Sequence, residues 1–425
     1  MRKIVTSSER HEARYKRRRQ KRLAKCQEKR IQCSFEHMFS YNDWIDATVA
    51  CKRNVYYKSA VQLYMDHPLI HMYEKVQEIK KGKIPFRINT CRIIIRERGK
   101  ERKIEPIMFE KRIGEHVFCD NIYLPYFRDL MIYDNGASIK GRGTNFARKR
   151  MLRHLEKALR EYGVEFHAWQ FDFKSFFESI KYYICEQILR NHFKDERTID
   201  FSIDSITEYT KGNIEINLKV NPEIAEQLQQ KLESGNGEGI CLGSQNSQIT
   251  ALIVPNELDH FIKDICRMKY YCRYMDDGIV LHNDKKYLKE LWNKCQVICK
   301  KLGLSFNTKK TKIVKVSRGF VFLKTKYQVT KDGKILRRPH RSGIVRNRRR
   351  LKRFAHLVEI GKMSLDDVYN SFQSYYNHTK KIGKSFKTRK QMIKQYIKLF
   401  GGYKLDKLLG KRYKGGNLNV VLQSN

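Results

Sequence analysis

Residues 270–281 read YYCRYMDDGIVL, two short apolar segments on either side of adjacent carboxylates at Asp276 and Asp277. The apolar segments predict a β-hairpin whose tip carries both aspartates. Adjacent carboxylates repel each other, which disfavours ionisation of both, and a cation of higher charge removes that penalty. The pattern therefore favours a metal site. A plain surface turn is the alternative, because Asp-Asp-Gly is also good turn chemistry.

A third aspartate strengthens the metal interpretation. Asp172 lies far upstream in FDFKSFF, residues 171–177, and residues 166–172 are predicted to form the strand that carries it. One isolated aspartate and a distant pair are what a two-metal nucleotidyl-transfer site requires, with two Mg²⁺ ions about 3.5–4 Å apart. In such a site the ions activate the 3′-hydroxyl of a primer and stabilise the leaving pyrophosphate.

The charge of the chain points to a polyanionic partner. Its 425 residues include 88 Lys and Arg against 45 Asp and Glu, a formal net charge of +43. Such a field attracts nucleic acid and releases counterions on binding. Two runs concentrate the charge, RYKRRRQKR at residues 14–22 and RNRRR at residues 346–350. For the first run, RNA binding and a merely solvated helix are equally good interpretations.

Hydropathy and cysteine usage predict a cytoplasmic protein without a membrane association. No apolar run of 18 residues is present, and the charged N-terminus lacks a signal-peptide core. The 11 cysteines are scattered without a Cys-x-x-Cys pair, a pattern typical of reduced, buried thiols. With 41% hydrophobic residues, the chain has enough apolar side chains for well-packed cores.

The Tyr-Met-Asp-Asp box resembles the catalytic box of reverse transcriptases. Six further blocks resemble those of the bacterial members of this family, in the same order, across roughly residues 85–400. The resemblance implies an α+β fold of the right-hand polymerase type, with fingers, an antiparallel-sheet palm and a helical thumb. The six blocks are residues 98–106 with 110–112, 134–144, 172–177, 239–248, 304–311 and 319–323.

Four regions are expected on this basis. They are a basic helical N-terminal extension at residues 1–84, fingers at 85–165, a palm at 166–326 with an insertion at 200–235, and a basic helical thumb and tail at 327–425. Hydrophobic periodicity and turn residues predict the elements inside these regions. Helices are expected over 8–30, within 35–80, and over 108–124, 145–162, 222–233, 246–263, 284–302 and 343–400, and hairpins over 86–104 and 327–337.

The resemblance implies a role for each residue of the catalytic centre. Asp172 and Asp276 would ligate both Mg²⁺ ions, together with the backbone carbonyl of Phe173. Asp277 would complete the charge of the site, and Mn²⁺ is the alternative metal. Lys310 would be the general acid for the leaving pyrophosphate, with a merely solvated lysine as the alternative interpretation.

Further residues would bind the nucleotide and the nucleic acid. Arg102 and Lys103 would reach the triphosphate, where cations stabilise the transition state. Phe177 would lie under the sugar and exclude a 2′-hydroxyl; core packing beside Phe176 in a strand-like run is the alternative. The other implied contacts are Gly243 and Gln248 to the nucleotide, and Arg142, Tyr274, Gly319, Phe320, Arg346, Arg349, Arg350 and Arg353 to nucleic acid.

The second basic run lies where a thumb would grip the template–primer duplex. Helical spacing at i, i+3, i+4 and i+7 puts four of its arginines, 346, 349, 350 and 353, on one face. A stripe of this kind favours contact with a phosphate backbone over a merely solvated face.

One block departs from the common pattern and bears on the biological role. Group II intron and retroviral enzymes usually carry Gln-Gly-x-x-x-Ser-Pro where this chain has LGSQNSQ, residues 242–248. That form is similar to reverse transcriptases of diversity-generating retroelements and to stand-alone bacterial enzymes of phage defence. The residues after Phe400 show no integrase or RNase H pattern.

The sequence therefore predicts a bacterial RNA-directed DNA polymerase that uses deoxynucleoside triphosphates and a dedicated, structured noncoding RNA in antiviral defence. A mutagenic retroelement enzyme is the alternative role. A non-catalytic RNA-binding protein on a polymerase scaffold is the alternative of another class. The expected partners are the RNA template and the DNA product. A protein partner and a homo-oligomer stay open, and so does the primer, which would be RNA, DNA or a protein hydroxyl.

Overall fold

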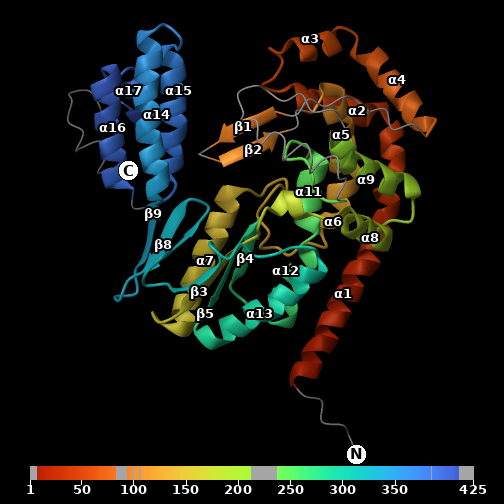
Figure 1. The fold of residues 1–425 in the computed structure, drawn as a ribbon, viewed down its shortest axis with the longest axis horizontal. Coiled ribbons are helices and arrows are strands. Elements are labelled where there is room, and N and C mark those ends of the chain that lie inside the picture. Colours follow the sequence, from red (N-terminus) through yellow and green to blue (C-terminus); the bar gives the residue numbers. More distant parts are fainter. Residues whose placement is uncertain are drawn as a thin grey trace, which may run out of the picture. The chain divides into compact units, whose positions relative to one another are not determined.

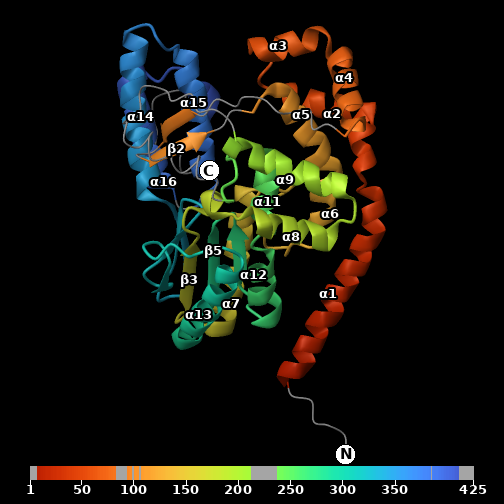
Figure 2. The same ribbon diagram turned by 45° about the vertical axis from the view of Figure 1, so that its right-hand side comes forward.

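The computed structural model describes residues 7–82, 93–97, 100–104, 107–211, 237–383 and 385–410. The chain folds into two compact units, drawn as a ribbon in Figures 1 and 2. The four regions predicted from the sequence are defined by their expected roles and not by how compactly they fold, so that division stays a prediction. Unit 1 contains Met1–Met151, Phe171–Val280 and Lys286–Lys312, and unit 2 contains Leu152–Gln170, Leu281–Lys285 and Ile313–Asn425.

Helices form the N-terminal part of unit 1 (red and orange in Figure 1). The long basic helix α1 is followed by three shorter helices with a buried core. Trp44 in this core is fully buried and donates its indole N–H to the Met38 carbonyl at 3.0 Å. The predicted helices over 8–30 and within 35–80 are confirmed. They are α1 Ser7–Gln32, α2 Tyr41–Lys52, α3 Ser59–Asp66 and α4 Pro68–Lys80.

A hairpin and a helical segment follow α4. Strands β1 and β2 pair antiparallel with Glu97 opposite Lys100, which confirms the hairpin predicted within 86–104. The helix predicted over 108–124 is present as α5, a π-helical turn and α6. Helix α7 is followed by Gly163, whose φ of +67° lies in the left-handed region that favours glycine just after a helix end. The bounds are β1 Ile93–Glu97, β2 Lys100–Ile104, α5 Phe109–Phe118, α6 Leu124–Arg128 and α7 Thr144–Tyr162.

Four strands in the order β4-β5-β3-β6 form the sheet that carries the predicted acidic residues. The helix predicted over 284–302 is confirmed as α13. Residues 200–211 of the predicted insertion belong to α9, and the helix predicted over 222–233 lies outside the described residues. The elements are β3 His167–Asp172, α8 Tyr182–His192, α9 Glu196–Lys211, α11 Gln245–Ile253, α12 Asn256–His260, β4 Tyr271–Tyr274, β5 Asp277–His282, α13 Lys285–Lys301 and β6 Lys312–Lys315.

The prediction of one continuous helix over 246–263 is wrong. Helix α11 ends at Ile253 and α12 begins at Asn256, with Pro255 between them. Proline has no N–H to donate, and its ring clashes with the carbonyl four residues earlier, so a regular helix does not continue through it. The resulting kink separates two helices whose side chains both contribute to the site described below.

Unit 2 contains a three-stranded antiparallel sheet in the order β7-β8-β9, followed by helices that pack around a common core. The hairpin predicted over 327–337 is confirmed, with Gly333 at a φ of +73° in its turn. The helical stretch predicted over 343–400 is confirmed, and Leu351, Phe372 and Tyr396 are fully buried in its core. The bounds are β7 Phe320–Phe322, β8 Thr325–Val329, β9 Ile335–Pro339, α14 Arg341–Glu359, α15 Leu365–Lys380, α16 Phe386–Phe400 and α17 Leu405–Leu409.

These elements give the predicted α+β class. Helices dominate, and the pairings β1–β2, β4–β5, β7–β8 and β8–β9 are antiparallel. Within the described ranges, no helix combines the length and the apolar character that a membrane crossing needs.

Candidate active site

The acidic hairpin has the predicted form. Strands β4 and β5 pair antiparallel with Tyr274 opposite Asp277, so Met275 and Asp276 form a two-residue turn. Met275 has a φ of +54°, a conformation that residues with a Cβ rarely adopt. Strain of this kind persists only where surrounding structure holds it, and it clusters at functional sites.

A buried ion pair holds this turn in place. Arg273 is fully buried and donates from Nη1 to the Met275 carbonyl at 2.9 Å. Its Nε and Nη2 donate to the carboxylate of Asp259, also fully buried, at 2.8 and 2.7 Å. The Tyr271 hydroxyl donates to the same carboxylate at 2.5 Å, and Nη2 of the arginine also donates to the Leu252 carbonyl at 2.9 Å. The guanidinium thereby ties the strained turn to both α11 and α12.

Close packing brings the end of β3 alongside the hairpin. A Cβ on Gly278 would lie 2.1 Å from the ring of Phe171, so only glycine fits at this position of β5. Asp172 follows that ring in sequence and is only 4% exposed. Its carboxyl group lies close enough to that of Asp277 to help raise the pKa of Asp277. The structure thus brings the predicted isolated aspartate together with the Asp-Asp pair.

The concentration of negative charge changes the protonation of Asp277. Burial, followed by the charges of Asp276 and Asp172, raises the pKa of Asp277 from 3.8 to about 7. Carboxylates that share one buried site cannot all ionise without a cost in free energy. Without a metal, the site therefore holds a proton up to neutral pH.

Lys310 is the cation that faces these carboxylates. Its Nζ donates to both carboxylate oxygens of Asp172, at 2.7 and 2.6 Å. Backbone hydrogen bonds fix this approach: Asn307 donates to the Asp172 carbonyl at 2.7 Å, and Lys310 donates to the Asn307 carbonyl at 3.1 Å. Burial lowers the pKa of Lys310, but the hydrogen bond to Asp172 and the acidic neighbours raise it by more. The ammonium is therefore protonated, as a proton donor must be.

The donor set fits a divalent cation. Among the described residues, no group of three or more His, Cys, Asp or Glu side chains is already arranged around one metal position. The chemistry nevertheless matches, because a single ammonium offsets three carboxylates only in part, and hard oxygen donors suit Mg²⁺. The residues that would hold the ions are Asp172, Asp276, Asp277 and the carbonyl of Phe173.

The two phenylalanines after the first aspartate differ in exposure. The prediction of a strand-like run is wrong here, because Ser175 adopts a φ of +45° and Phe176–Ser179 form a 3₁₀ turn. Phe176 is 6% exposed and stacks on Phe173 with ring centroids 5.0 Å apart. Phe177 is partly exposed. Core packing thus belongs to Phe176, and the role of Phe177 as the sugar gate stays a prediction.

A buried carboxylate supports the loop predicted to line the nucleotide. Gly243 lies in this loop, and Ser244 caps the N-terminus of α11. The hydroxyl of Ser244 donates to the carboxylate of Glu115 at 2.9 Å, and burial raises the pKa of Glu115. Gln248, one turn into the helix, accepts a hydrogen bond from the Ser138 hydroxyl at 3.3 Å. Gly243 and Gln248, which are predicted to contact the nucleotide, therefore lie on a loop and a helix that hydrogen bonds hold in place.

Four further predicted residues lie in unit 1. Arg142 donates to the Asn135 carbonyl at 2.9 Å, and its guanidinium lies over the ring of Tyr133 at 5.3 Å. Tyr274 is partly buried against the core. Arg102 and Lys103 lie on β2, and their side chains are outside the described part of the chain. The contacts predicted for these residues stay predictions.

Gly319 and Phe320 belong to unit 2. Gly319 has a φ of +81°, and a Cβ there would lie 2.8 Å from the Tyr327 carbonyl oxygen. Phe320 is 2% exposed and stacks on the ring of Tyr327 with centroids 5.6 Å apart. Its ring is therefore part of the sheet's core, and a predicted contact with the primer would come from the backbone.

The basic stripe on α14 is divided between solvent and the core of unit 2. Arg346, Arg349 and Arg353 are exposed. Arg350 is half-buried, with its guanidinium 5.7 Å from the ring centroid of Phe354, and burial lowers its pKa. Three arginines of the predicted stripe are thus free to face a polyanion, and the fourth packs against the helices.

Sequence reasoning missed three residues of the site, namely Arg273, Asp259 and Glu115. Each is charged and buried, and charged side chains are almost never fully buried unless they are paired. Arg273 stands among apolar neighbours in a strand, which is a signal that it needs a buried partner. Nothing in the local sequence identifies that partner.

Comparison with known proteins adds a family and two similar structures. Residues 138–327 match the family described as reverse transcriptase (RNA-dependent DNA polymerase). No curated protein matches the chain. A structure of apo telomerase from Candida tropicalis, truncated from its C-terminal domain, has a TM-score of 0.41 at 13% identity, over 64% of this chain and 60% of that chain. Telomerase from Candida albicans in complex with a TWJ fragment of telomeric RNA has a TM-score of 0.43 at 13% identity, over 80% and 63%. The chain thus spans less than two thirds of either telomerase chain.

Proposed function

We propose that this chain, which carries a reverse transcriptase domain at residues 138–327, copies RNA into DNA. One observation carries the proposal: inside this domain, Asp172 and the Asp276–Asp277 turn converge, and the ammonium of Lys310 lies against them. A merely structural turn would not need three carboxylates in a site where burial and repulsion oppose their ionisation.

Each residue has a proposed task. Asp172 and Asp276 hold the metal ions with the Phe173 carbonyl, and Asp277 completes the negative charge. When bound, the ions stabilise charge on the attacking and leaving oxygens. Lys310 holds a proton on Nζ and donates it to the leaving pyrophosphate.

The substrate side of the proposal rests on three further residues. Arg102 and Lys103 bind the triphosphate of the incoming nucleotide. Phe177 leaves room for a deoxyribose and excludes a 2′-hydroxyl. We propose Mg²⁺ as the ion, because oxygen-only donor sets with substrate phosphates are typical of it. Mn²⁺ is the alternative.

A dedicated, structured noncoding RNA is the proposed template, and antiviral defence in a bacterial cytoplasm is the proposed role. The basic surface of α1 supports the first part, because its exposed arginines offer phosphate contacts. The LGSQNSQ block, residues 242–248, supports a mutagenic retroelement enzyme as the second candidate role. Sequencing the RNA and DNA that co-purify with the protein separates these roles.

The activity test uses the purified full chain, an RNA template with a DNA primer, Mg²⁺ and deoxynucleoside triphosphates. We expect primer extension by the native protein and none by the double variant Asp276→Ala with Asp277→Ala. RNA affinity and the melting temperature of the double variant should not fall, because the substitutions remove like charges. The variant Asp46→Asn, at an exposed position of α2, serves as the control and should be fully active.

Two outcomes contradict the proposal. Incorporation by the double variant within tenfold of the native rate would remove the metal role of the aspartates. Tight RNA binding by the native protein with no extension from RNA, DNA or protein primers would favour the non-catalytic alternative.

A further inference from the structure

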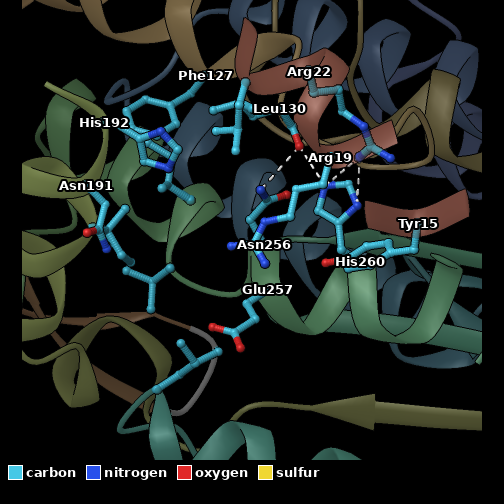
Figure 3. Close-up of a pocket in the computed structure, with 15 residues that line it drawn as sticks. Tyr15, Arg19, Arg22, Phe127, Leu130, Asn191, His192, Asn256, Glu257 and His260 are labelled. Carbon is cyan, nitrogen blue, oxygen red and sulfur yellow. Dashed lines mark hydrogen bonds between the residues drawn. The ribbon is translucent and has the colours of Figure 1, made fainter. Parts of the chain in front are cut away.

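A cavity of about 220 Å³ lies in unit 1, between the basic helix α1, the end of α8 and the kink that joins α11 to α12 (Figure 3). Typical pockets for drug-sized ligands measure ~300–1,000 Å³. This cavity is therefore suited to a single ring system rather than to a whole nucleotide. The catalytic residues are not among those that line it.

Helix α1 is held firmly enough to form one wall of the cavity. Arg22 donates from Nη2 to the carboxylate of Asp264 at 3.0 Å, and its Nη1 lies 2.9 Å from Nδ1 of His260. The other ring nitrogen of that histidine lies 2.7 Å from the Leu130 carbonyl oxygen. These contacts connect α1, α12 and the segment after α6 in one network.

The interior combines an apolar floor with polar groups at the edges. Phe127 and Leu130 are buried and present apolar surface. Asn256 donates from Nδ2 to the Leu130 carbonyl at 3.2 Å, while its Oδ1 is buried and has no hydrogen-bond partner among the described residues. Asn191 and His192 lie on the opposite side of the cavity (Figure 3). A flat ring with hydrogen-bonding groups on its edge matches this distribution.

The positive charge of α1 beside the cavity indicates that such a ring would be attached to a phosphate. Arg19 lines the cavity from an exposed position of α1, and Arg17 and Arg18 next to it are also exposed. No acidic residue interrupts the run from residue 14 to residue 22. Glu257 lines the cavity from an exposed position and disfavours a phosphate next to it, whereas the arginines disfavour a metal cation. Burial, with the charges of Arg30 and Arg19, lowers the pKa of His192 to about 4, so its ring is neutral.

We propose that this cavity binds one unstacked base of a single-stranded RNA segment whose phosphate backbone lies along α1. The base lies against the apolar floor, donates a hydrogen bond to Oδ1 of Asn256, and meets the amide of Asn191 at the rim. Base recognition and backbone contact are thus assigned to different residues of one site. The inference rests on the proposed function in one respect, namely that RNA is the substrate class.

Two cavity variants test the proposal. Ile188→Trp fills the cavity from α8, and Asn191→Ala removes an exposed rim amide whose loss does not threaten folding. The matched control is Arg17→Gln with Arg18→Gln. It removes two side-chain cations proposed to contact the RNA phosphates and leaves the cavity intact. The probes are four twelve-nucleotide homopolymer RNAs, each with a single type of base, and an abasic ribose-phosphate oligomer of the same length. The affinity for each probe is measured across a series of salt concentrations.

The expected results separate the two kinds of contact. Filling the cavity should weaken the preferred RNA by roughly 5- to 150-fold, the range for losing one stacked base, with no change in affinity for the abasic probe or in the salt slope. Asn191→Ala should weaken the same RNA by a smaller factor. The control should weaken all probes equally and flatten the salt slope by about 1.4, because each of the two lost single-strand phosphate contacts contributes about 0.7.

Equal affinity of native protein and both cavity variants for every RNA would overturn the proposal. So would a native protein that binds the abasic probe as tightly as RNA. Extension of a poly(rA)–oligo(dT) primer by the same preparations reports on the proposed function separately. Native extension together with a failed cavity test refutes only the base site.

Discussion

Asp277→Asn should stabilise the metal-free protein at alkaline pH. The pKa of Asp277 rises from 3.8 to about 7 on folding, through burial and the charges of Asp276 and Asp172. One pKa unit corresponds to ~1.36 kcal/mol, so ionising this carboxyl in the folded protein costs at most about 4 kcal/mol. Between these two pH values the folded state binds more protons than the unfolded state. The native protein therefore loses stability as the pH rises through that window.

Asparagine has nearly the shape of aspartate but does not ionise, so the variant does not lose stability as the pH rises through this window. Urea denaturation in EDTA should show similar stabilities near pH 4 and a variant more stable by up to about 4 kcal/mol at pH 8. Added Mg²⁺ should narrow the difference, because an ion at 100 times its dissociation constant contributes ~2.7 kcal/mol to the native protein alone. Asp46→Asn, at an exposed position, should follow the native curve. A variant that is less stable than native protein at pH 8 in EDTA would refute the reasoning about the charge cluster.

Three other sets of substitutions give equally direct tests. Phe177→Ala should admit ribonucleotides in a comparison of dNTP and rNTP incorporation. Phe176→Ala should lower the melting temperature without changing the selectivity for deoxyribonucleotides, since Phe176 is in the core. The reverse pattern would exchange the roles of the two residues. Replacing Arg346, Arg349 and Arg353 with Gln should lower the slope of log affinity against log salt concentration for template–primer binding by roughly two to three. Arg350→Gln should leave this slope unchanged. An unchanged slope for the triple variant would mean that the stripe does not contact the duplex. Asp259→Asn should cost about 3–5 kcal/mol in urea denaturation, because it leaves the buried charge of Arg273 without its partner; a loss below 1 kcal/mol would show that the pair does not support the hairpin.

Local signals were sufficient for much of the fold and for the acidic core of the site. The Asp-Asp-Gly turn marks the tip of the β4–β5 hairpin, and Gly163 marks the end of α7. Apolar spacing locates α7. These features depend on residues close together in sequence, where turn chemistry and periodicity apply directly.

The remainder depends on packing between distant segments. The continuous helix predicted over 246–263 is interrupted at Pro255, although the residues on both sides have helical spacing. The turn after Asp172 depends on the left-handed φ of Ser175, a residue type that rarely adopts it. The contact between Glu115 and Ser244 joins residues 129 positions apart. No local pattern specifies such a pair, because it forms only once the intervening chain has folded.

The most direct measurement is the chemical identity of the product made on an RNA template. The native chain, a labelled DNA primer, RNA and Mg²⁺ should yield a product that DNase degrades and RNase does not, with a sequence complementary to the template. Asp172→Asn keeps the shape of the side chain and removes one proposed metal ligand, so it should yield none while binding RNA normally. Synthesis by Asp172→Asn at the native rate, or a native product that RNase degrades, would contradict the assignment of an RNA-directed DNA polymerase centred on Asp172, Asp276 and Asp277.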